Sequence, residues 1–318
     1  CVIAVLFAGP ALADFPETVG TRILPGYADF AKTTQALAQT AQQSCDLATL
    51  QPAFNAAFDA WVAVQHIQFG PIEDNGNRLA IEYWPDPKGQ GAKAQRALLQ
   101  GDPAQLAPDA FAEQSVAARG LSGLERLIYP AESAGVDTCP LIRATALDLA
   151  RMAADVQAAW VDDYAATALS AGDQANTTFL NRSEVRQVMF TQIASGLEFL
   201  ADTRLGRPLG TFDAPHPERA ESKASGRSLR NVVLSLQAMQ AMAQSLTPDA
   251  PLTAAAFQRA IDLAQALDDP IFAGVASPDG RLKVEILQQA VTATRDVVIS
   301  ELGPELDVGI GFNAQDGD

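Results

Sequence analysis

Two short segments carry residues whose types and spacing suggest chemistry. One ends in Gln65 and His66, at the end of an aromatic-rich helical pattern, and the other is Gly120-Leu-Ser122-Gly-Leu-Glu125. Ser122 and Glu125 are three residues apart and share one helical face. Imidazole and carboxylate groups bind metal ions, so His66 and Glu125 are the candidate metal ligands. Glu125 is also the candidate general base if the protein is a hydrolase.

These residues also have plainer structural explanations. A histidine in a last helical turn can interact with the terminal carbonyls, and Glu125 can pair with Arg126 or with a neighbouring helix. Glycines inside a helix cost roughly 1 kcal/mol each relative to alanine. That cost is easier to understand if a backbone or a ligand packs closely against Gly120 and Gly123.

Other segments add or exclude chemistry. Ser225-Gly-Arg227-Ser places an arginine beside small polar residues at a helix start, which is compatible with an anion. The only other histidine, His216, lies between two prolines in a loop. The sequence has no His-Glu-x-x-His, Cys-x-x-Cys, glycine-rich phosphate loop or Gly-x-Ser-x-Gly motif.

The composition favours packed helices and a cationic partner. The 318 residues carry a net charge of −16, with 48% hydrophobic and 7% aromatic residues. A low aromatic content with abundant alanine is typical of helices more than of strands. The acidic balance disfavours nucleic acid and anionic lipid, which are bound through clustered lysine and arginine. No stretch after the first residues is long and apolar enough to span a membrane, so we expect no transmembrane segment.

Helical periodicity extends through most of the chain. An irregular stretch at 70–90 is dense in glycine, proline, asparagine and aspartate. The expected helices cover residues 27–43, about 46–69, 91–100, 108–129, 140–169, 177–204, 226–246, 252–268 and 280–302. Long helices with short connections and no alternating pattern predict an all-α fold of two helical bundles, covering 14–170 and 171–318.

The first residues indicate export. Residues 1–13 form an uncharged apolar run that ends in Ala-Leu-Ala, which reads as the remnant of a cleaved signal peptide. We expect no lipid anchor, because Cys1 opens this run instead of closing it. The mature protein then keeps only Cys45 and Cys139, and an even pair in an oxidising compartment predicts a disulfide. Two free buried thiols are the alternative.

An internal similarity supports two related halves. Residues 122–127, Ser-Gly-Leu-Glu-Arg-Leu, match residues 195–200, Ser-Gly-Leu-Glu-Phe-Leu, at five of six positions. Descent of the two bundles from one unit would explain this, and coincidence in a chain rich in alanine and leucine is the alternative.

Five segments, in order along nearly the whole chain after residue 13, resemble the imelysin family. They are Trp61-Val-Ala-Val-Gln-His-Ile-Gln-Phe-Gly-Pro71, Tyr83-Trp84-Pro85-Asp86, Gly120-Leu-Ser-Gly-Leu-Glu-Arg-Leu127, Ser225-Gly-Arg-Ser-Leu-Arg-Asn231 and Gly311-Phe-Asn-Ala-Gln-Asp-Gly-Asp318. The family signature is Gly-x-His-x-x-Glu, whose histidine is replaced here by Ser122. The chain is similar to the predicted-lipoprotein-like branch of the family, although it lacks a lipobox cysteine.

The resemblance implies an exported, all-helical protein of two bundles related by an internal repeat, with a site between them. It also implies a link to bacterial iron uptake and, through the founding members, to M75-type metallopeptidases. Serine is a poor metal ligand and a zinc hydrolase needs about three protein ligands, so a binding role is favoured over peptidase activity.

We therefore expect a periplasmic protein that binds iron or an iron-loaded ligand between its two bundles, with envelope iron-transport components as possible partners. The expected ligand-binding residues are Gln65, Trp84, Gly120, Ser122 and Arg227. An arginine beside a metal favours a ligand of mixed charge, such as an iron–carboxylate complex, or else a pairing of Arg227 with Glu125. A metallopeptidase, and a helical scaffold without a small-molecule site, are the alternatives.

Overall fold

The computed structural model describes residues 14–130 and 135–309, and it confirms the all-α prediction for them. Their only strand-like feature is an isolated bridge between Thr211 and Ala214. The α-helices are α1 (Phe15–Thr18), α2 (Leu24–Gln43), α3 (Leu47–Val64), α4 (Asn77–Ile81), α5 (Gln90–Gln100), α6 (Pro108–Ala112), α7 (Gly120–Ile128), α8 (Cys139–Ala159), α9 (Ala165–Leu169), α10 (Arg182–Glu198), α11 (Gly206–Leu209), α12 (Ser228–Leu246), α13 (Pro251–Gln265), α14 (Pro278–Val297) and α15 (Gly303–Glu305). The expected signal-peptide remnant and the segment 311–318 lie outside the described residues.

Shorter helical turns connect or extend these helices. The 3₁₀ turns are η2 (Gly70–Gly76), η3 (Pro103–Leu106), η4 (Val116–Ala118), η7 (Pro217–Arg219) and η8 (Ala273–Ala276). The π-helical turns are η1 (Val19–Ile23), η5 (Trp160–Tyr164), η6 (Phe199–Leu205) and η9 (Val298–Leu302). Each π-helical turn continues a neighbouring α-helix, so α8, η5 and α9 together cover the helix expected at 140–169.

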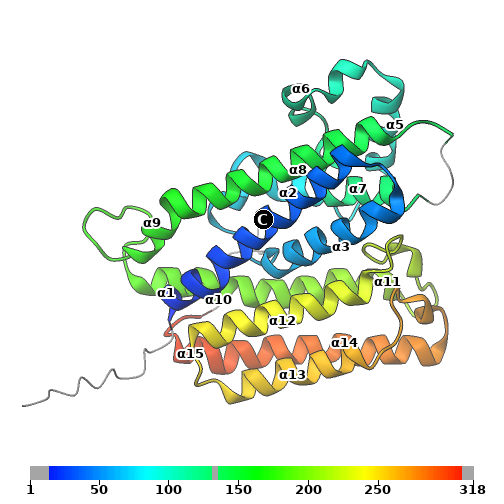
Figure 1. Ribbon diagram of the computed structural model, residues 1–318. Helices are drawn as coiled ribbons and strands as arrows, with labels where there is room; N and C mark the ends of the chain where they lie inside the picture. The colour runs from blue at the N-terminus through cyan, green and yellow to red at the C-terminus, as the bar shows by residue number, and fades with distance from the viewer. Residues whose placement is uncertain (1–13, 131–134, 310–318) are drawn as a thin grey trace, which may run out of the picture.

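Two layers of helices make up the fold (Figure 1). One contains α2, α3 and α8, and the other contains α10, α12, α13 and α14. The chain passes from the first layer to the second between α9 and α10, while α3 packs on α12 across the boundary. The short α1 packs on α12 and α10, so the start of the described chain contacts the second layer. The division into domains 14–170 and 171–318 stays a prediction.

Aromatic side chains fill the core of the first layer. Tyr27 of α2 stacks on Trp160 at a centroid distance of 5.9 Å, and Phe30 lies 5.3 Å from Trp61 of α3. All four side chains are almost completely buried. Burying a large apolar side chain contributes about 1.5–3 kcal/mol. These contacts fix the position of α3, the helix that faces the second layer.

Some helix boundaries differ from those expected. The helix expected at 108–129 is divided into α6, η4 and α7. The backbone of Arg119 is extended, and its buried guanidinium bonds Asp148 at 2.8 Å and the carbonyl of Ala112 at 2.6 Å. These bonds hold a turn where periodicity alone suggested a continuous helix. The helix expected from 177 begins instead at Arg182, where the side chain of Asn181 accepts from the N–H of Glu184.

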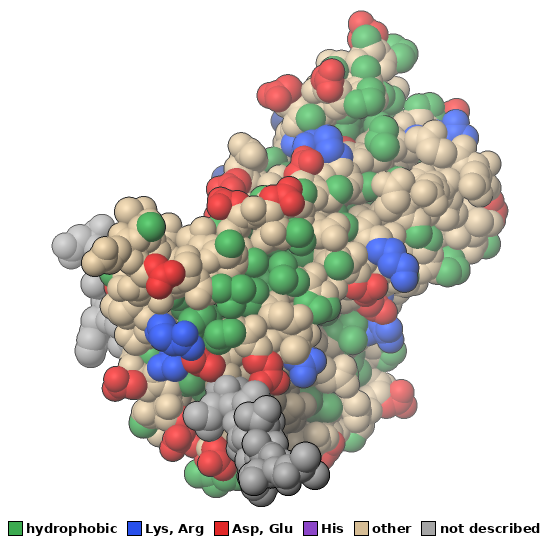
Figure 2. Space-filling model, turned by 60° about the vertical axis from the view of Figure 1, so that its left-hand side comes forward, with side chains coloured by type: hydrophobic (Ala, Val, Ile, Leu, Met, Phe, Trp, Pro, Cys, Tyr) green, Lys and Arg blue, Asp and Glu red, His purple; other side chains and the backbone are tan. Residues whose placement is uncertain are grey.

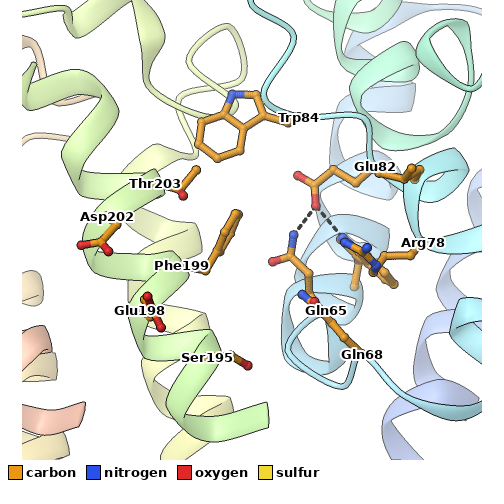
Figure 3. Close-up of a pocket in the computed structure, with 12 residues that line it drawn as sticks. Gln65, Gln68, Arg78, Glu82, Trp84, Ser195, Glu198, Phe199, Asp202 and Thr203 are labelled. Atoms are coloured by element: carbon orange, nitrogen blue, oxygen red, sulfur yellow. Dashed lines mark hydrogen bonds between the residues drawn. The ribbon is translucent and has the colours of Figure 1, made fainter. Parts of the chain in front are cut away.

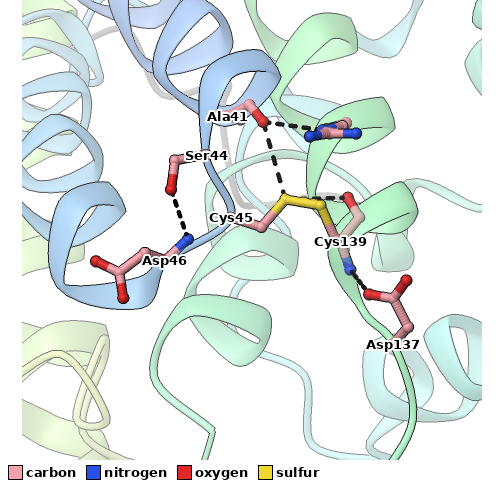
Figure 4. Close-up of a disulfide and its surroundings, with 7 residues drawn as sticks. Ala41, Ser44, Cys45, Asp46, Asp137 and Cys139 are labelled. Carbon is pink, nitrogen blue, oxygen red and sulfur yellow. Dashed lines mark hydrogen bonds between the residues drawn. A yellow bond between two sulfur atoms is a disulfide. The ribbon is translucent and has the colours of Figure 1, made fainter.

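The predicted disulfide between Cys45 and Cys139 is confirmed (Figure 4). Cys45 lies between α2 and α3, Cys139 begins α8, and their Cα atoms are 5.6 Å apart. On the chain-entropy model, closing a loop of this length stabilises the fold by about 4–5 kcal/mol. The bond therefore holds α8 against the α2–α3 connection.

The surface mixes both signs of charge. On the face shown in Figure 2, basic groups have acidic neighbours. Elsewhere in the described residues the ion pairs include those of Arg182 and Arg186 with Asp14, at 2.9 and 2.7 Å. Within residues 14–130 and 135–309, no helix combines the length and apolar character that crossing a bilayer requires.

Candidate functional site

A cavity of about 350 Å³ lies between the two layers (Figure 3). Its first wall comes from the end of α3, from α4 and from the segment after α4, and its second wall comes from α10 and η6. The lining residues are Trp61, Gln65, Gln68, Arg78, Leu79, Glu82, Trp84, Ser195, Glu198, Phe199, Asp202 and Thr203. Two expected ligand-binding residues, Gln65 and Trp84, are thus brought together at this cavity.

Close backbone packing positions the first wall. Gly120 begins α7 with a φ of +62°, and a Cβ atom there would lie 2.2 Å from the carbonyl oxygens of both Ala80 and Ile81. Only glycine permits this approach. The end of α4 therefore rests on α7, and Glu82 follows directly with its side chain turned inward. Gly120 supports the cavity through its backbone and is not among the lining residues.

Glu82 is the buried acid of the cavity. Its side chain is only 6% exposed, and its Oε2 accepts from Nε1 of Trp61 at 2.6 Å and from Nε2 of Gln65. Its Oε1 has no partner. In Figure 3 the free oxygen faces the gap toward Trp84 and Thr203. Burial, followed by repulsion from Glu221, raises the pKa of Glu82 to about 8, although Arg204 opposes the shift.

Behind Glu82 lies a buried group of charged and polar side chains from both layers. Nε of Arg204 lies 2.8 Å from Oε2 of Glu221, in an ion pair whose N–H is not aligned for a hydrogen bond. The other guanidinium nitrogens of Arg204 donate to Ser235 and to Oε1 of Gln65. We call Gln65, Glu82, Arg204, Glu221 and Ser235 the carboxyl cluster. Gln65 joins the layers by donating to Glu82 and accepting from Arg204.

Glu125 lies near this cluster but has its own partner. Its Oε1 accepts from the backbone N–H and the hydroxyl of Ser225, at 2.9 and 2.7 Å. Burial raises the pKa of Glu125, and the bonds from Ser225 oppose that shift. Ser122, one helical turn earlier, is partly buried on α7. Neither residue lines the cavity.

Arg227 does not pair with Glu125, contrary to one of the sequence-based alternatives. Its guanidinium donates to Asp59 at 2.5 Å and to the side-chain oxygen of Asn55 at 2.9 Å. The arginine is 2% exposed, whereas Arg230, which also pairs with Asp59, is largely exposed. Burial raises the pKa of Asp59, but the bonds from Arg230 and Arg227 outweigh it and lower the pKa overall. Because a carboxylate on α3 already neutralises Arg227, the argument for a ligand of mixed charge loses its basis.

His66 points away from the cavity into the packed interior. Its Nε2 lies 3.2 Å from the sulfur of Met242, and its Nδ1 has no partner. Burial lowers the pKa of His66 to about 4, so the ring is neutral at physiological pH. Within residues 14–130 and 135–309, no group of three or more histidine, cysteine, aspartate or glutamate side chains is placed to hold a metal ion. A metal site built on His66 and Glu125 is therefore not assembled there.

Several cavity residues were missed by sequence reasoning. Glu82 directly precedes Tyr83 and Trp84, which the family resemblance includes. Its burial could not be predicted from the sequence, because it depends on the packing of α4 against α7. Ser195, Glu198 and Phe199 belong to the second copy of the internal similarity, so that repeat was the signal that could have located this wall. The walls meet at Trp84 and Phe199, whose rings are perpendicular with centroids 6.2 Å apart. The cavity thus offers aromatic surface, amides and carboxyl groups to a small ligand.

Comparisons with known proteins agree on one family. The model of the imelysin family, Peptidase_M75, matches residues 23–298. A protein named iron-regulated protein A from Synechococcus elongatus is 26% identical over 314 residues, covering 89% of this chain and 83% of that protein.

Two solved structures share the fold. An imelysin-like protein from Psychrobacter arcticum has a TM-score of 0.79 at 19% identity, covering 93% of this chain and 95% of its own. A structure named for an iron-regulated protein A precursor from Parabacteroides distasonis has a TM-score of 0.64 at 15% identity, covering 90% and 93%. At such identities the likeness establishes the arrangement of the helices and nothing about their ligands.

Proposed function

The chain belongs to the imelysin family, and from this premise we propose that it is an exported, periplasmic protein that binds an iron-loaded ligand in the cavity between its helical layers. Iron is the cargo in this proposal and is carried as a complex with a small organic chelator. The name of the Synechococcus relative supports the connection with iron. Envelope iron-transport components would deliver or receive the complex.

The observation that carries the proposal is the cavity with the unpartnered oxygen of Glu82. Small-molecule sites are concave, occupy roughly 300–1,000 Å³ and combine apolar walls with a few aimed polar groups. A buried polar atom without a partner costs about 1–3 kcal/mol, which a ligand that hydrogen-bonds to it would recover. Trp84 and Phe199 supply the apolar wall.

The charges of the lining indicate which complexes fit. The lining includes the side chains of Glu198 and Asp202, the buried and protonated Glu82, and one guanidinium, that of Arg78. Arg78 is already paired with Glu73 at 2.9 Å. An anionic complex such as ferric citrate would be repelled, whereas a neutral or cationic chelate would not. The lining therefore favours a chelate that presents an ammonium group to Glu198 or Asp202 and a neutral hydrogen-bonding group to the protonated Glu82.

Titration with iron complexes of different charge tests this proposal. The probes are a neutral ferric trihydroxamate, a ferric trihydroxamate with a free ammonium group, and ferric citrate. Tryptophan fluorescence reports binding, because Trp61 and Trp84 line the cavity. We expect the ammonium-bearing complex to bind most tightly and ferric citrate least. Failure of the folded protein to bind any of the three would contradict the proposal and leave the scaffold alternative.

A matched pair of variants locates the binding. Asp202→Asn removes a charge from the cavity wall, and Asp162→Asn removes one from an exposed position outside it. The first should weaken binding of the ammonium-bearing complex about fivefold, or roughly 1 kcal/mol, and the second should leave it unchanged. A peptide-cleavage assay runs in parallel. Metal-dependent cleavage that is lost in Glu125→Ala would favour the peptidase alternative.

A further inference from the structure

His66 is a buried histidine whose only side-chain partner is a thioether. Nε2 lies 3.2 Å from the sulfur of Met242, and Nδ1 has no partner although the residue is only 9% exposed. A hydrophobic residue would fill this position without burying a polar ring, which costs free energy when the ring is not fully hydrogen-bonded. The cavity uses Gln65 and leaves His66 unexplained.

A second methionine sulfur lies nearby. Met239 is one helical turn before Met242 on α12, so both side chains project from one face. A Cβ atom built on Gly196 of α10 would lie 2.6 Å from the Met239 sulfur and 3.3 Å from Cβ of His66. The Met239 sulfur and the Cβ atom of His66 therefore both lie beside Gly196, where any side chain larger than hydrogen would clash with the sulfur.

The resulting group is uncharged and closed to solvent. We call His66, Met239 and Met242 the sulfur cluster. Both methionines are 1% exposed, and they are two of only four in the chain. Burial alone lowers the pKa of His66, and no charged neighbour contributes to the shift. Methionine is a common gap-filling residue in cores, but packing does not require an imidazole ring against the Met242 sulfur.

We propose that the sulfur cluster binds a cuprous ion, with His66, Met239 and Met242 as its three ligands. Thioether and imidazole donors select soft metals such as Cu(I), whereas iron and calcium prefer oxygen-rich sites. All three ligands are neutral, so the site gains one positive charge, which a dry interior accommodates better than the two or three charges of iron.

His66 and Met242 need only a small movement to bind an ion between them. With metal–nitrogen and metal–sulfur distances of about 2.0 and 2.3 Å, as for zinc, the two donor atoms must be roughly 3.5–4 Å apart. The nitrogen and the Met242 sulfur are at 3.2 Å. The unbranched side chain of methionine has three rotatable bonds and can supply the difference.

Anaerobic titration of the full chain with Cu(I) against a chromogenic Cu(I) chelator tests the proposal, with the thiol of Cys1 alkylated beforehand. We expect one equivalent to be retained, and X-ray absorption to show two sulfur atoms and one nitrogen around copper. Met242→Leu and Met239→Leu should each weaken binding at least tenfold, and His66→Leu should abolish it. Met189→Leu, at another fully buried methionine on α10, is the matched control and should bind like the wild type.

Separate measurements distinguish a loss of copper binding from a loss of folding and from the binding of iron complexes. Leucine preserves the volume of methionine, and a thermal melt verifies that each variant folds. Cu(I) should raise the melting temperature of the wild type and of Glu82→Gln, but not that of Met242→Leu. No retained copper in the folded wild type, or equal retention by Met242→Leu and Met189→Leu, would overturn the proposal. Either result would leave the iron titrations unaffected, because those concern the cavity.

Discussion

Gln65 and His66 are neighbours in the sequence, yet their side chains enter regions of opposite character. Gln65 belongs to the carboxyl cluster, where acids and an arginine from both layers share hydrogen bonds beside an open cavity. His66 belongs to the sulfur cluster, which is uncharged and closed. The difference shows that one interface can offer a hard, polar site and a soft, dry site less than one helical turn apart.

The contrast originates in α12. One face of this helix carries the buried residues Ser228, Asn231 and Ser235, followed by Met239 and Met242 at the same helical spacing. The polar half of this stripe meets Asn55 and Asp59 through Arg227, and the sulfur half meets His66. Helices α3 and α12 therefore run in the same direction, and a change of composition along one stripe divides their interface into two environments.

The largest loss of stability is expected at the polar half of the α12 stripe, where a buried guanidinium depends on one carboxylate. Asp59→Asn leaves Arg227, at 2% exposure, without its carboxylate. Losing one partner of a buried ion pair costs about 3–5 kcal/mol. Chemical denaturation should show a loss of this size. Arg230→Ala is the control, because this exposed arginine shares Asp59 and should cost less than about 1 kcal/mol. Equal effects of the two changes would mean that burial does not distinguish the pairs.

The second largest loss of stability is expected at Gly120, whose close backbone packing supports the wall that carries Glu82. Gly120→Ala adds a Cβ atom 2.2 Å from two carbonyl oxygens at a φ of +62°, so both overpacking and backbone strain oppose it, at a cost of about 3 kcal/mol. Gly226→Ala is matched in backbone conformation, with a φ of +71°, but has open space around it and should cost only about 1–2 kcal/mol. Thermal unfolding of both variants measures the difference. If the packing argument is wrong, the two melting temperatures will fall equally.

The third effect depends on pH. The folded-state pKa of Glu82, about 8, is above its ordinary value of 4.5, so the native state binds the extra proton between these values. The stability contributed by this group therefore falls as pH rises from 4.5 to 8 and is constant above. Glu82→Gln imitates the protonated acid. Relative to wild type it should gain about 2–3 kcal/mol of stability between pH 6 and pH 9.

Urea titrations of both proteins at the two pH values measure that gain. Glu305→Gln is a suitable control, because Glu305 is exposed and should show no such pH-dependent difference. A gain that is independent of pH would mean that Glu82 is not protonated in the folded protein.

Local patterns predicted the helices better than they predicted the site. Apolar spacing located α2, α3 and α12 to within a few residues, and cysteine counting gave the disulfide. The break before α7 was missed because Arg119 is turned by Asp148, 29 residues away. At the cavity, motif residues gave Gln65 and Trp84. The other members of the carboxyl cluster were missed because they come together only when the layers meet, as in the contact between Gln65 and Arg204 over 139 residues.

The smallest effect is a gain of stability instead of a loss, and it is expected in the sulfur cluster. Without metal, His66→Leu removes a buried ring nitrogen that has no partner and retains apolar volume beside Met242. Replacing an incompletely bonded polar group by an apolar one of similar size should stabilise the fold by about 1 kcal/mol. Denaturation in the presence of a metal chelator measures it. A loss of stability in His66→Leu would instead mean that the N–H···S contact is a structural bond that the fold needs.

The gain in His66→Leu should reverse when Cu(I) is added, because only the wild type then has a ligand that binds its folded state. A charge removed at Asp59 and a ring removed at His66 would thus change stability in opposite directions along one pair of helices.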